Sequence, residues 1–306
     1  MRWPVAGRRI LFRMAGTATT ISSRTNARVK QLRAAFAGQD RLSGGLLAIE
    51  GEHLVEEALR SGIALQTIFL TDRRTPDGVS DEVEIVHLTS DVFASAVETR
   101  SPQGIAALIA PPHFEMVDIL ERQPSALLII AAGLQDPGNM GTIVRSAEAF
   151  GASGVVTTPG SVSPWNQKAL RASAGSIFRV PVIPSTLEEI AALQTSQCIR
   201  LFAAVGAAES GVVFAQDADL RRPSGILIGN EGSGLGREWL QLATERITIP
   251  CPGPVESLNA AIAASLLLYE ASRQRSAALQ REQTALAQTI SRIPGPLRRR
   301  PTGANR

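Results

Sequence analysis

Apolar and polar residues follow two different periods along the chain, and this predicts alternating helices and strands. In residues 51–60, apolar side chains recur every three or four positions, so they share one face of a helix, and Gly62 provides a stop signal. Before residue 111, the same criteria predict helices over residues 22–36, 51–60 and 90–97. They predict strands over residues 46–49, 67–70, 83–88 and 104–109.

The alternation starts again after a segment that contains Pro111, Pro112 and Pro124, which we interpret as a linker with room for one short helix. Residues 126–132 are all apolar, as in a strand covered on both faces of a parallel sheet. Further strands are expected over residues 154–157, 201–205, 225–228 and 246–249. Further helices are expected over residues 141–150, 165–171, 187–193, 236–243 and 258–275.

These elements predict an α/β protein of two domains, and 306 residues supply enough material for two cores. A small α/β domain covers residues 21–111 and a larger one covers residues 125–275, with residues 112–124 between them. Residues 1–20 form a basic extension. Residues 276–306 form a basic tail that has few apolar residues to bury and is expected to be disordered.

Charge is concentrated at the two ends of the chain. Residues 1–33 carry eight Arg or Lys and no acid, and residues 272–306 carry eight Arg and one Glu. Since the formal net charge of the whole chain is +3, the middle of the chain carries −12. Basic ends on an acidic body fit a protein that binds a polyanion such as RNA. For the C-terminal tail, a solvated segment without a partner explains the pattern equally well.

Composition excludes several classes of protein. Cys198 and Cys251 are far apart and form no cluster that suits zinc, so we expect no metal and a reducing compartment. No apolar run is long enough to span a membrane, and arginines interrupt the first apolar stretch, which argues against a signal peptide. A cytoplasmic location is expected. Because the first acid is Asp40, a mitochondrial transit peptide is the alternative, and a true start at Met14 is another explanation.

Parallel sheets bind ligands beyond the carboxyl ends of their strands, so the loops after the predicted strands are the candidate sites. The first such loop and its helix cover residues 135–151 and include Asn139 and Arg145. By spacing alone, a solvated ion pair with Glu148, three residues later, is the favoured explanation of Arg145.

Two further loops carry polar residues. Residues 228–236 contain four glycines, with Asn230 and Glu231 among them, in a spacing that is neither the dinucleotide-binding fingerprint nor a phosphate-binding P-loop. Residues 249–265 begin with three prolines at alternate positions. In that loop, Ser257 or Asn259 is expected to cap the long helix that follows.

Taken together and in this order, the three loops resemble the signature motifs of the SpoU (TrmH) branch of the SPOUT methyltransferases. The matching residues are Asn139, Gly141, Arg145 and Gly151 in the first motif, Gly229, Asn230, Glu231, Gly232, Gly234 and Leu235 in the second, and Ile249, Pro250, Ser257, Leu258 and Asn259 in the third. The resemblance covers residues 127–275. Residues 48–62, AIEGEHLVEEALRSG, resemble the small RNA-recognition module often attached to this family. Two departures are Ala260, where the family often has Val, and the Arg-rich tail.

The resemblance implies a parallel sheet whose C-terminal segment threads a loop to form a deep trefoil knot, and a homodimer whose active sites borrow residues from the partner. It implies S-adenosylmethionine as the cofactor, held by Gly229, Gly232, Ile249, Leu258 and Asn259, and methyl transfer to a ribose 2′-hydroxyl. It also implies four residues that orient either the reacting hydroxyl or the cofactor, namely Asn139, Glu231, Ser257 and Asn259. Arg145 is expected to lie at that hydroxyl. Because a guanidinium stays protonated, we expect it to stabilise the developing alkoxide rather than to remove a proton.

The substrate indicated by the accessory domain is large-subunit rRNA, with tRNA as the alternative. Two other classes compete with a methyltransferase: a noncatalytic RNA-binding protein, and a nucleotide-dependent enzyme on an unknotted sheet. A noncatalytic RNA-binding protein has no need to keep Asn139, Arg145, Glu231 and Asn259 together. A nucleotide-dependent enzyme is disfavoured because the sequence lacks the dinucleotide-binding and P-loop motifs. The small molecule that the purified protein retains would distinguish the three.

Overall fold

The computed structural model describes residues 20–38, 45–206, 211–255 and 257–291. The chain forms two compact units, Met1–Pro112 and His113–Arg306. In the described part of the chain, no helix combines the length and the apolar character that crossing a membrane requires.

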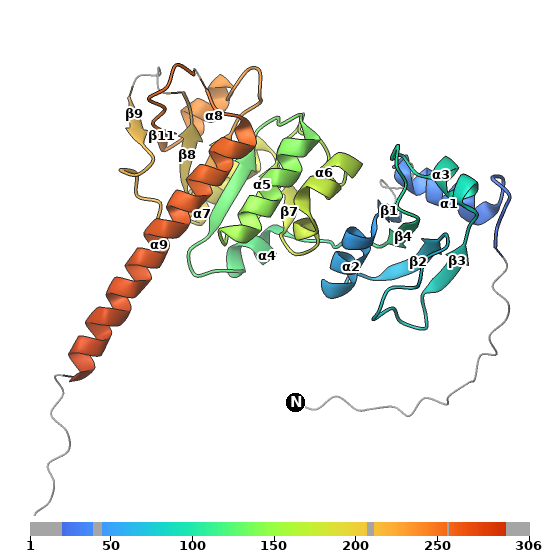
Figure 1. The fold of residues 1–306 in the computed structure, drawn as a ribbon. Coiled ribbons are helices and arrows are strands. Elements are labelled where there is room, and N and C mark those ends of the chain that lie inside the picture. The colour runs from blue at the N-terminus through green and yellow to red at the C-terminus, as the bar shows by residue number, and fades with distance from the viewer. Residues whose placement is uncertain (1–19, 39–44, 207–210, 256, 292–306) are drawn as a thin grey trace, which may run out of the picture. The chain divides into compact units, whose positions relative to one another are not determined.

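The first unit is a four-stranded sheet with helices on it (Figure 1). Its elements are α1 (Ala27–Phe36), β1 (Leu47–Glu50), α2 (Glu52–Arg60), β2 (Leu65–Leu70), β3 (Glu84–His87), α3 (Ser90–Ala96) and β4 (Ile105–Ile109). The strand order is β1-β4-β2-β3, in which only the β2–β3 pair is parallel. Its core includes Val29 and Leu32 of α1, Phe93 of α3 and Phe69 of β2. The predicted α/β character is confirmed.

The second unit is built on a seven-stranded sheet. Its elements are α4 (Met116–Glu121), β5 (Leu127–Ala131), α5 (Pro137–Ala149), β6 (Gly154–Thr157), α6 (Gln167–Ser173), the 3-10 helix η2 (Ser176–Phe178), β7 (Val182–Pro184), α7 (Leu187–Ser196), β8 (Arg200–Ala204), β9 (Val212–Phe214), β10 (Ser224–Ile228), α8 (Arg237–Leu242), β11 (Glu245–Thr248) and α9 (Ala260–Ser291). The strand order is β7-β6-β5-β10-β8-β11-β9, and every pairing is parallel.

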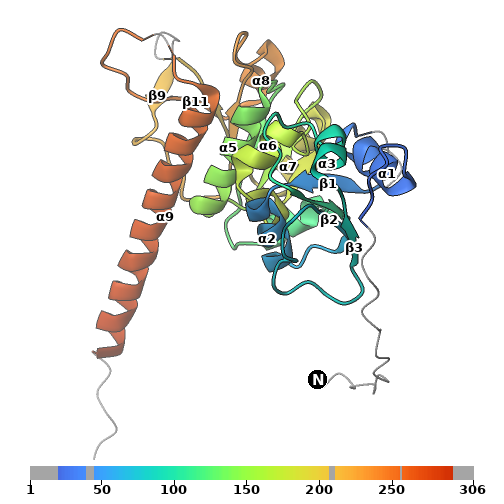
Figure 2. The same ribbon diagram turned by 45° about the vertical axis from the view of Figure 1, so that its right-hand side comes forward.

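The central strands β5 and β10 are buried along their whole length, as their apolar sequences predict. On one face of the sheet, α5 and α9 lie side by side, which both ribbon views show (Figures 1 and 2). A hydrogen bond of 2.7 Å between the Ser146 and Ser265 hydroxyls joins them. The other face contributes a core in which Ile119 of α4 and Ile190 of α7 pack with β5. The parallel sheet predicted for the larger domain is confirmed, whereas the threading that would tie a knot stays a prediction.

Several helix boundaries differ from expectation, and side-chain caps explain them. The first helix begins at Ala27 rather than at residue 22, because the Asn26 side chain accepts a hydrogen bond from the Arg28 N–H. Likewise α5 begins at Pro137 rather than at residue 141, because Asp136 caps it and proline suits the first turn of a helix.

The last helix was expected to end at residue 275, but α9 continues to Ser291. The expectation of a disordered tail from residue 276 is therefore wrong for residues 276–291, and residues 292–306 lie outside the described residues. Two strands of three residues, β7 and β9, were not predicted. One short helix in the linker was expected, and α4 lies there.

Candidate active site

Three loops meet at the carboxyl edge of the large sheet, and their side chains are joined by hydrogen bonds. The Asn139 Nδ2 donates to Glu231 Oε1 over 2.9 Å, and the Asn259 Nδ2 donates to Asn139 Oδ1 over 3.0 Å. Asn139 lies in the first turn of α5, after β5; Glu231 lies in the loop after β10; and Asn259 ends the loop between β11 and α9. The three sequence motifs are thus connected by one chain of hydrogen bonds, Glu231–Asn139–Asn259.

Glu231 also accepts two backbone hydrogen bonds, from the Gln135 N–H over 3.3 Å and the Asp136 N–H over 3.1 Å. Burial raises the pKa of the Glu231 carboxyl, but the hydrogen bond from Asn139 and those from the backbone outweigh burial and lower the pKa. The carboxylate is therefore ionised at neutral pH and fixes both the loop before α5 and the Asn139 side chain.

The two asparagines are held at helix N-termini. The Asp136 side chain caps α5 by accepting from the Asn139 N–H over 2.8 Å, and the Lys168 ammonium lies 2.7 Å from the other Asp136 oxygen. Asn259 caps α9, because its Oδ1 accepts from the Ala261 and Ile262 N–H groups over 2.9 and 3.2 Å. Of the two candidate caps for this helix, Asn259 fills the role. These caps fix the backbone that carries the chain of hydrogen bonds.

The glycine-rich loop after β10 folds back on itself. A Cβ on Gly229 would lie 2.3 Å from the Gly234 carbonyl carbon, so only glycine fits there. The Asn230 Oδ1 accepts from the Gly232 and Ser233 N–H groups over 2.9 and 3.2 Å. Asn230 therefore shapes the loop.

Gly141 in the first motif has a packing role. A Cβ there would lie 2.2 Å from the Ala169 carbonyl oxygen, so glycine lets α5 and α6 approach closely.

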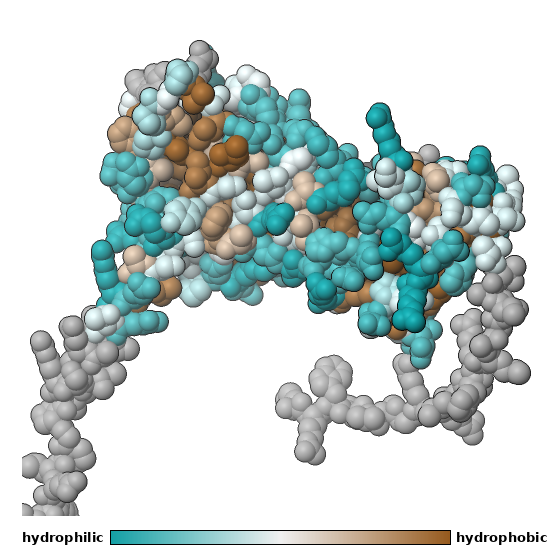
Figure 3. Space-filling model, in the orientation of Figure 1, coloured by the Kyte–Doolittle hydropathy of each residue, from teal (hydrophilic) through white to brown (hydrophobic). Residues whose placement is uncertain are grey.

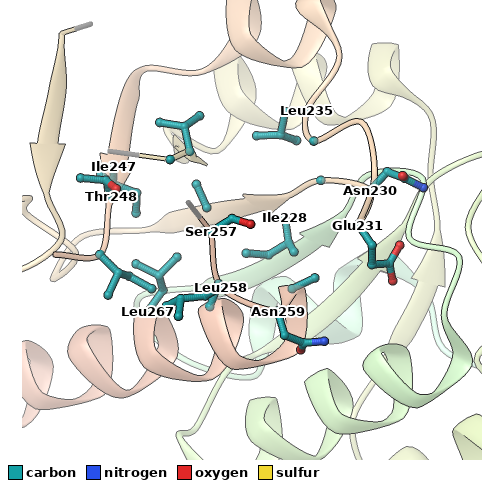
Figure 4. Close-up of a pocket in the computed structure, with 18 of the residues that line it drawn as sticks. Ile228, Asn230, Glu231, Leu235, Ile247, Thr248, Ser257, Leu258, Asn259 and Leu267 are labelled. Atoms are coloured by element: carbon teal, nitrogen blue, oxygen red, sulfur yellow. The ribbon is translucent and has the colours of Figure 1, made fainter. Parts of the chain in front are cut away.

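A pocket of about 700 Å³ opens between the second and third loops (Figure 4). All five residues expected to hold the cofactor line it: Gly229, Gly232, Ile249, Leu258 and Asn259. Ile228, Leu235, Ile247 and Leu267 supply apolar walls, while Glu231 and Asn259 lie at one end. A hollow that combines apolar side chains with polar groups and exposed backbone suits a nucleoside-sized ligand.

The candidate catalytic residues do not all converge within this chain. Ser257 is exposed and lines the pocket, and Asn139 joins the pocket residues through its hydrogen bonds. Arg145 lies exposed on α5 and does not line the pocket, and its guanidinium has no hydrogen bond or ion pair with any described residue. The alternative ion pair with Glu148 is wrong, because both Glu148 oxygens bind Arg179, at 2.5 and 3.0 Å. Arg145 is therefore free to act elsewhere.

Sequence reasoning missed Asp136 and Lys168, which position Asn139. The signal for Asp136 was its place before a proline and three residues before Asn139, which is typical of a helix cap. No local signal connected Lys168 to it, since they are 32 positions apart. Among the described residues, no group of three or more His, Cys, Asp or Glu side chains could hold a metal ion.

The chain matches two family models. The SpoU rRNA Methylase family matches residues 126–269, and the MRM3-like substrate binding domain matches residues 26–107. A 23S rRNA (guanosine(2553)-2'-O)-methyltransferase, RlmP of Bacillus subtilis, is 34% identical over 254 residues, which cover 81% of this chain and 97% of RlmP. A 23S rRNA (uridine(2479)-2'-O)-methyltransferase of Streptomyces viridochromogenes is 30% identical, covering 84% of this chain and 93% of that enzyme.

Solved structures agree with these matches. The SpoU methyltransferase AviRb from Streptomyces viridochromogenes, in complex with the cofactor AdoMet, has a TM-score of 0.71 and 27% identity and covers 82% of this chain and 98% of that chain. An AdoMet-bound rRNA methyltransferase from Sinorhizobium meliloti has a TM-score of 0.73 and 27% identity, with coverage of 84% and 98%.

The chain belongs to the SpoU rRNA methylase family, as its three motifs indicated. It is an RNA methyltransferase that uses S-adenosylmethionine as its methyl donor and a ribose 2′-hydroxyl as its acceptor.

Proposed function

We propose that this enzyme methylates a ribose 2′-hydroxyl in large-subunit rRNA. Two relatives that match over nearly their whole length are named for 23S rRNA, which supports this choice over tRNA. We assign RNA selection to the domain of residues 21–111, which includes the substrate-binding match, and catalysis to residues 125–275. The bacterial relatives favour a cytoplasmic location, although one relative, in Xenopus tropicalis, is named as mitochondrial.

The observation that carries the proposal is the Glu231–Asn139–Asn259 chain of hydrogen bonds beside the 700 Å³ pocket. S-adenosylmethionine, when bound, supplies an electrophilic methyl group. Gly229, Gly232, Ile249 and Leu258 would hold it through backbone groups, and Asn259 would hold it from the end of the pocket. Asn139, Glu231 and Ser257 orient the ribose. The ribose 2′-hydroxyl would accept this methyl group in place of its proton, which would pass to solvent.

We further propose a homodimer in which Arg145 acts in the partner's site. Arg145 does not line the pocket of its own chain and has no partner among the described residues. Nearby, α9 exposes an apolar stripe of Ile262, Leu266 and Tyr269, which are 53%, 43% and 54% accessible. The Tyr269 ring packs edge-on against Phe150 of α5, 5.8 Å between centroids. Figure 3 shows hydrophobic side chains gathered over the first turns of α9. An isologous pairing through this stripe would bury it and would bring α5 of one protomer to the other.

The substrate is tested by mapping 2′-O-methylation in total RNA from cells with and without the gene. We expect one large-subunit rRNA nucleotide to lose its methyl group when the gene is absent, and purified enzyme with S-adenosylmethionine to restore it in rRNA from those cells. Loss of methylation in tRNA instead would establish the alternative substrate. An unchanged methylation map, together with no transfer by the purified enzyme, would contradict both.

Replacement of Arg145 by lysine tests the catalytic role of its guanidinium. Lysine keeps the charge but lacks the planar set of donors, so we expect single-turnover methylation to fall about 100-fold, as on removing a preorganised oxyanion donor. Calorimetric titration with S-adenosylmethionine should give unchanged affinity, because the pocket is intact. Near-normal methylation by the variant would remove Arg145 from the mechanism.

A mixing experiment tests whether Arg145 acts across the dimer. Sedimentation should first report about twice the 32.5 kDa chain mass. Arg145→Lys and Glu231→Gln are each expected to be nearly inactive, but co-expression produces heterodimers in which one site has both native residues. We expect co-expressed protein to recover roughly a quarter of wild-type activity. If the activity of the co-expressed protein were no greater than the summed activities of the two variants, Arg145 would act in the site of its own chain.

A further inference from the structure

A long stretch of the catalytic unit carries cations and no acids. From Ala149 to Leu187 the sequence contains Lys168, Arg171 and Arg179 but no Asp or Glu. This contrasts with the middle of the chain as a whole, which carries a net charge of −12 between its basic ends. The stretch includes α6, whose exposed face presents Lys168 and Arg171 three positions apart. One turn of a helix separates them, so their side chains leave the same surface.

Hydrogen bonds hold this stretch at the edge of the sheet where the active site lies. After β6, the Val162 N–H donates to the Leu134 carbonyl over 2.7 Å, and the Gly133 N–H donates to the Thr158 hydroxyl over 3.0 Å. The loop between β6 and α6 is therefore joined to the loop that leads into Asn139. The contact of Gly141 with α6 then fixes that helix against α5.

The three cations differ in how many of their N–H donors already bind other residues of the chain. Arg179 is committed to Glu148. Lys168 is 58% exposed and donates to Asp136, which leaves two of its three N–H donors for a ligand. The Arg171 side chain is exposed and has no hydrogen bond or ion pair with any described residue. Two exposed cations beside the asparagine of the first motif thus have unused donors.

We propose that Lys168 and Arg171 bind backbone phosphates of the substrate RNA next to the reacting nucleotide. Phosphate contacts from Lys and Arg fix the register of a nucleic acid without reading its sequence, which is what a site that acts on ribose requires. Lys168 would also fix the position of the RNA relative to Asn139, because Lys168 and Asn139 both donate to the Asp136 carboxylate. The two residues are positioning residues, and this inference rests on the proposed RNA substrate.

The binding test uses a single-stranded oligouridylate as the probe, titrated at several salt concentrations. Log affinity falls as log salt rises, and each lost phosphate contact to single-stranded RNA makes this slope less steep by about 0.7. The double variant Lys168→Ala/Arg171→Ala should therefore have a slope less steep by about 1.4. The matched control is Arg222→Ala, since Arg222 is 75% exposed and precedes β10, at the opposite edge of the sheet. We expect the control to keep the wild-type slope. A double variant with the slope of the control would overturn the proposal.

A second arm measures methylation and keeps the two proposals separable. We expect the KM for rRNA to rise about threefold in Arg171→Ala, with kcat within about twofold and S-adenosylmethionine affinity unchanged, because the Arg171 side chain contacts no residue of the candidate site and would bind the ground state and the transition state equally. Lys168→Arg should bind RNA normally, since it preserves a cation beside Asp136. If kcat fell at constant KM, phosphate binding would be refuted. If wild-type enzyme methylated no rRNA while the oligouridylate slope still depended on these residues, the proposed substrate would fail and this inference would stand.

Discussion

At the scale of single residues, Glu231 connects two of the three motifs. Its carboxylate accepts from Asn139 and from two backbone N–H groups, and these hydrogen bonds lower its pKa against the opposing effect of burial. Glutamine in its place keeps the shape but presents an NH₂ to N–H donors. We expect Glu231→Gln to lower the free energy of unfolding at neutral pH by about 0.5–1.5 kcal/mol, a loss that stays small because the carboxylate is exposed to solvent. Methylation should fall at least tenfold.

The stability difference should depend on pH. Because the pKa of Glu231 is lowered by folding, its contribution is present above the ordinary glutamate value of 4.5 and is lost as the pH falls through the lowered folded-state pKa. Urea denaturation of wild type and variant should thus show a difference at pH 7 that shrinks in acid. Glu121→Gln is the control, because the Glu121 carboxylate is exposed and has no hydrogen bond with a described residue. A difference that persists unchanged in acid would show that ionisation of Glu231 is not its source.

Which residues belong to the site could be predicted only through the family resemblance. Spacing alone explained Asn259 as a cap and Arg145 as the partner of Glu148. Asn259 caps α9 and also reaches Asn139, whereas Glu148 binds Arg179, 31 positions away. Contacts over such separations depend on how the helices pack, and no local pattern contains that information.

At the scale of elements, Arg275 anchors α9 to the sheet. Its guanidinium donates to the carbonyls of Ser125, Ala126, Leu220 and Arg222, and its burial lowers its pKa. Lysine cannot reach four carbonyls from one point. We therefore expect Arg275→Lys to lower the free energy of unfolding by about 1.5–3 kcal/mol, measured by chemical denaturation. Arg273→Lys, one turn from Glu270 on the exposed side, should change little. Equal effects of the two substitutions would contradict the anchoring role.

The predictable elements were those with a strong local signal. Strands β5 and β10 are apolar throughout because both faces are covered, and the sequence shows this directly. Strands β7 and β9 have three residues each and are partly exposed, so they leave no pattern. The end of α9 was misplaced because the charge and polarity after Arg275 suggested a solvated tail. No Gly or Pro interrupts the sequence until Pro294, and that feature favoured the longer helix.

At the scale of the whole molecule, strand order was the least predictable feature. The central pair joins β5 to β10, although β6, β7, β8 and β9 intervene in the sequence. The candidate site exists because this pairing places the segments after β5 and β10 side by side. An alternating helix and strand pattern indicates a parallel sheet but does not specify which strands are neighbours.

The division into two units predicts that RNA selection and cofactor binding are separable. The first unit, Met1–Pro112, includes the match to a substrate-binding domain, whereas every residue that lines the 700 Å³ pocket lies in the second unit. A protein that begins at His113 keeps α4, whose Ile119 packs in the core with β5. We expect it to fold, shown by circular dichroism, and to bind S-adenosylmethionine with wild-type affinity by calorimetry. Its methylation of rRNA should fall at least 100-fold, because the truncation removes the substrate-binding unit and the basic residues before it, which we expect to supply RNA affinity. If the folded truncated protein methylated rRNA at the wild-type rate, the RNA would be selected by the catalytic unit alone.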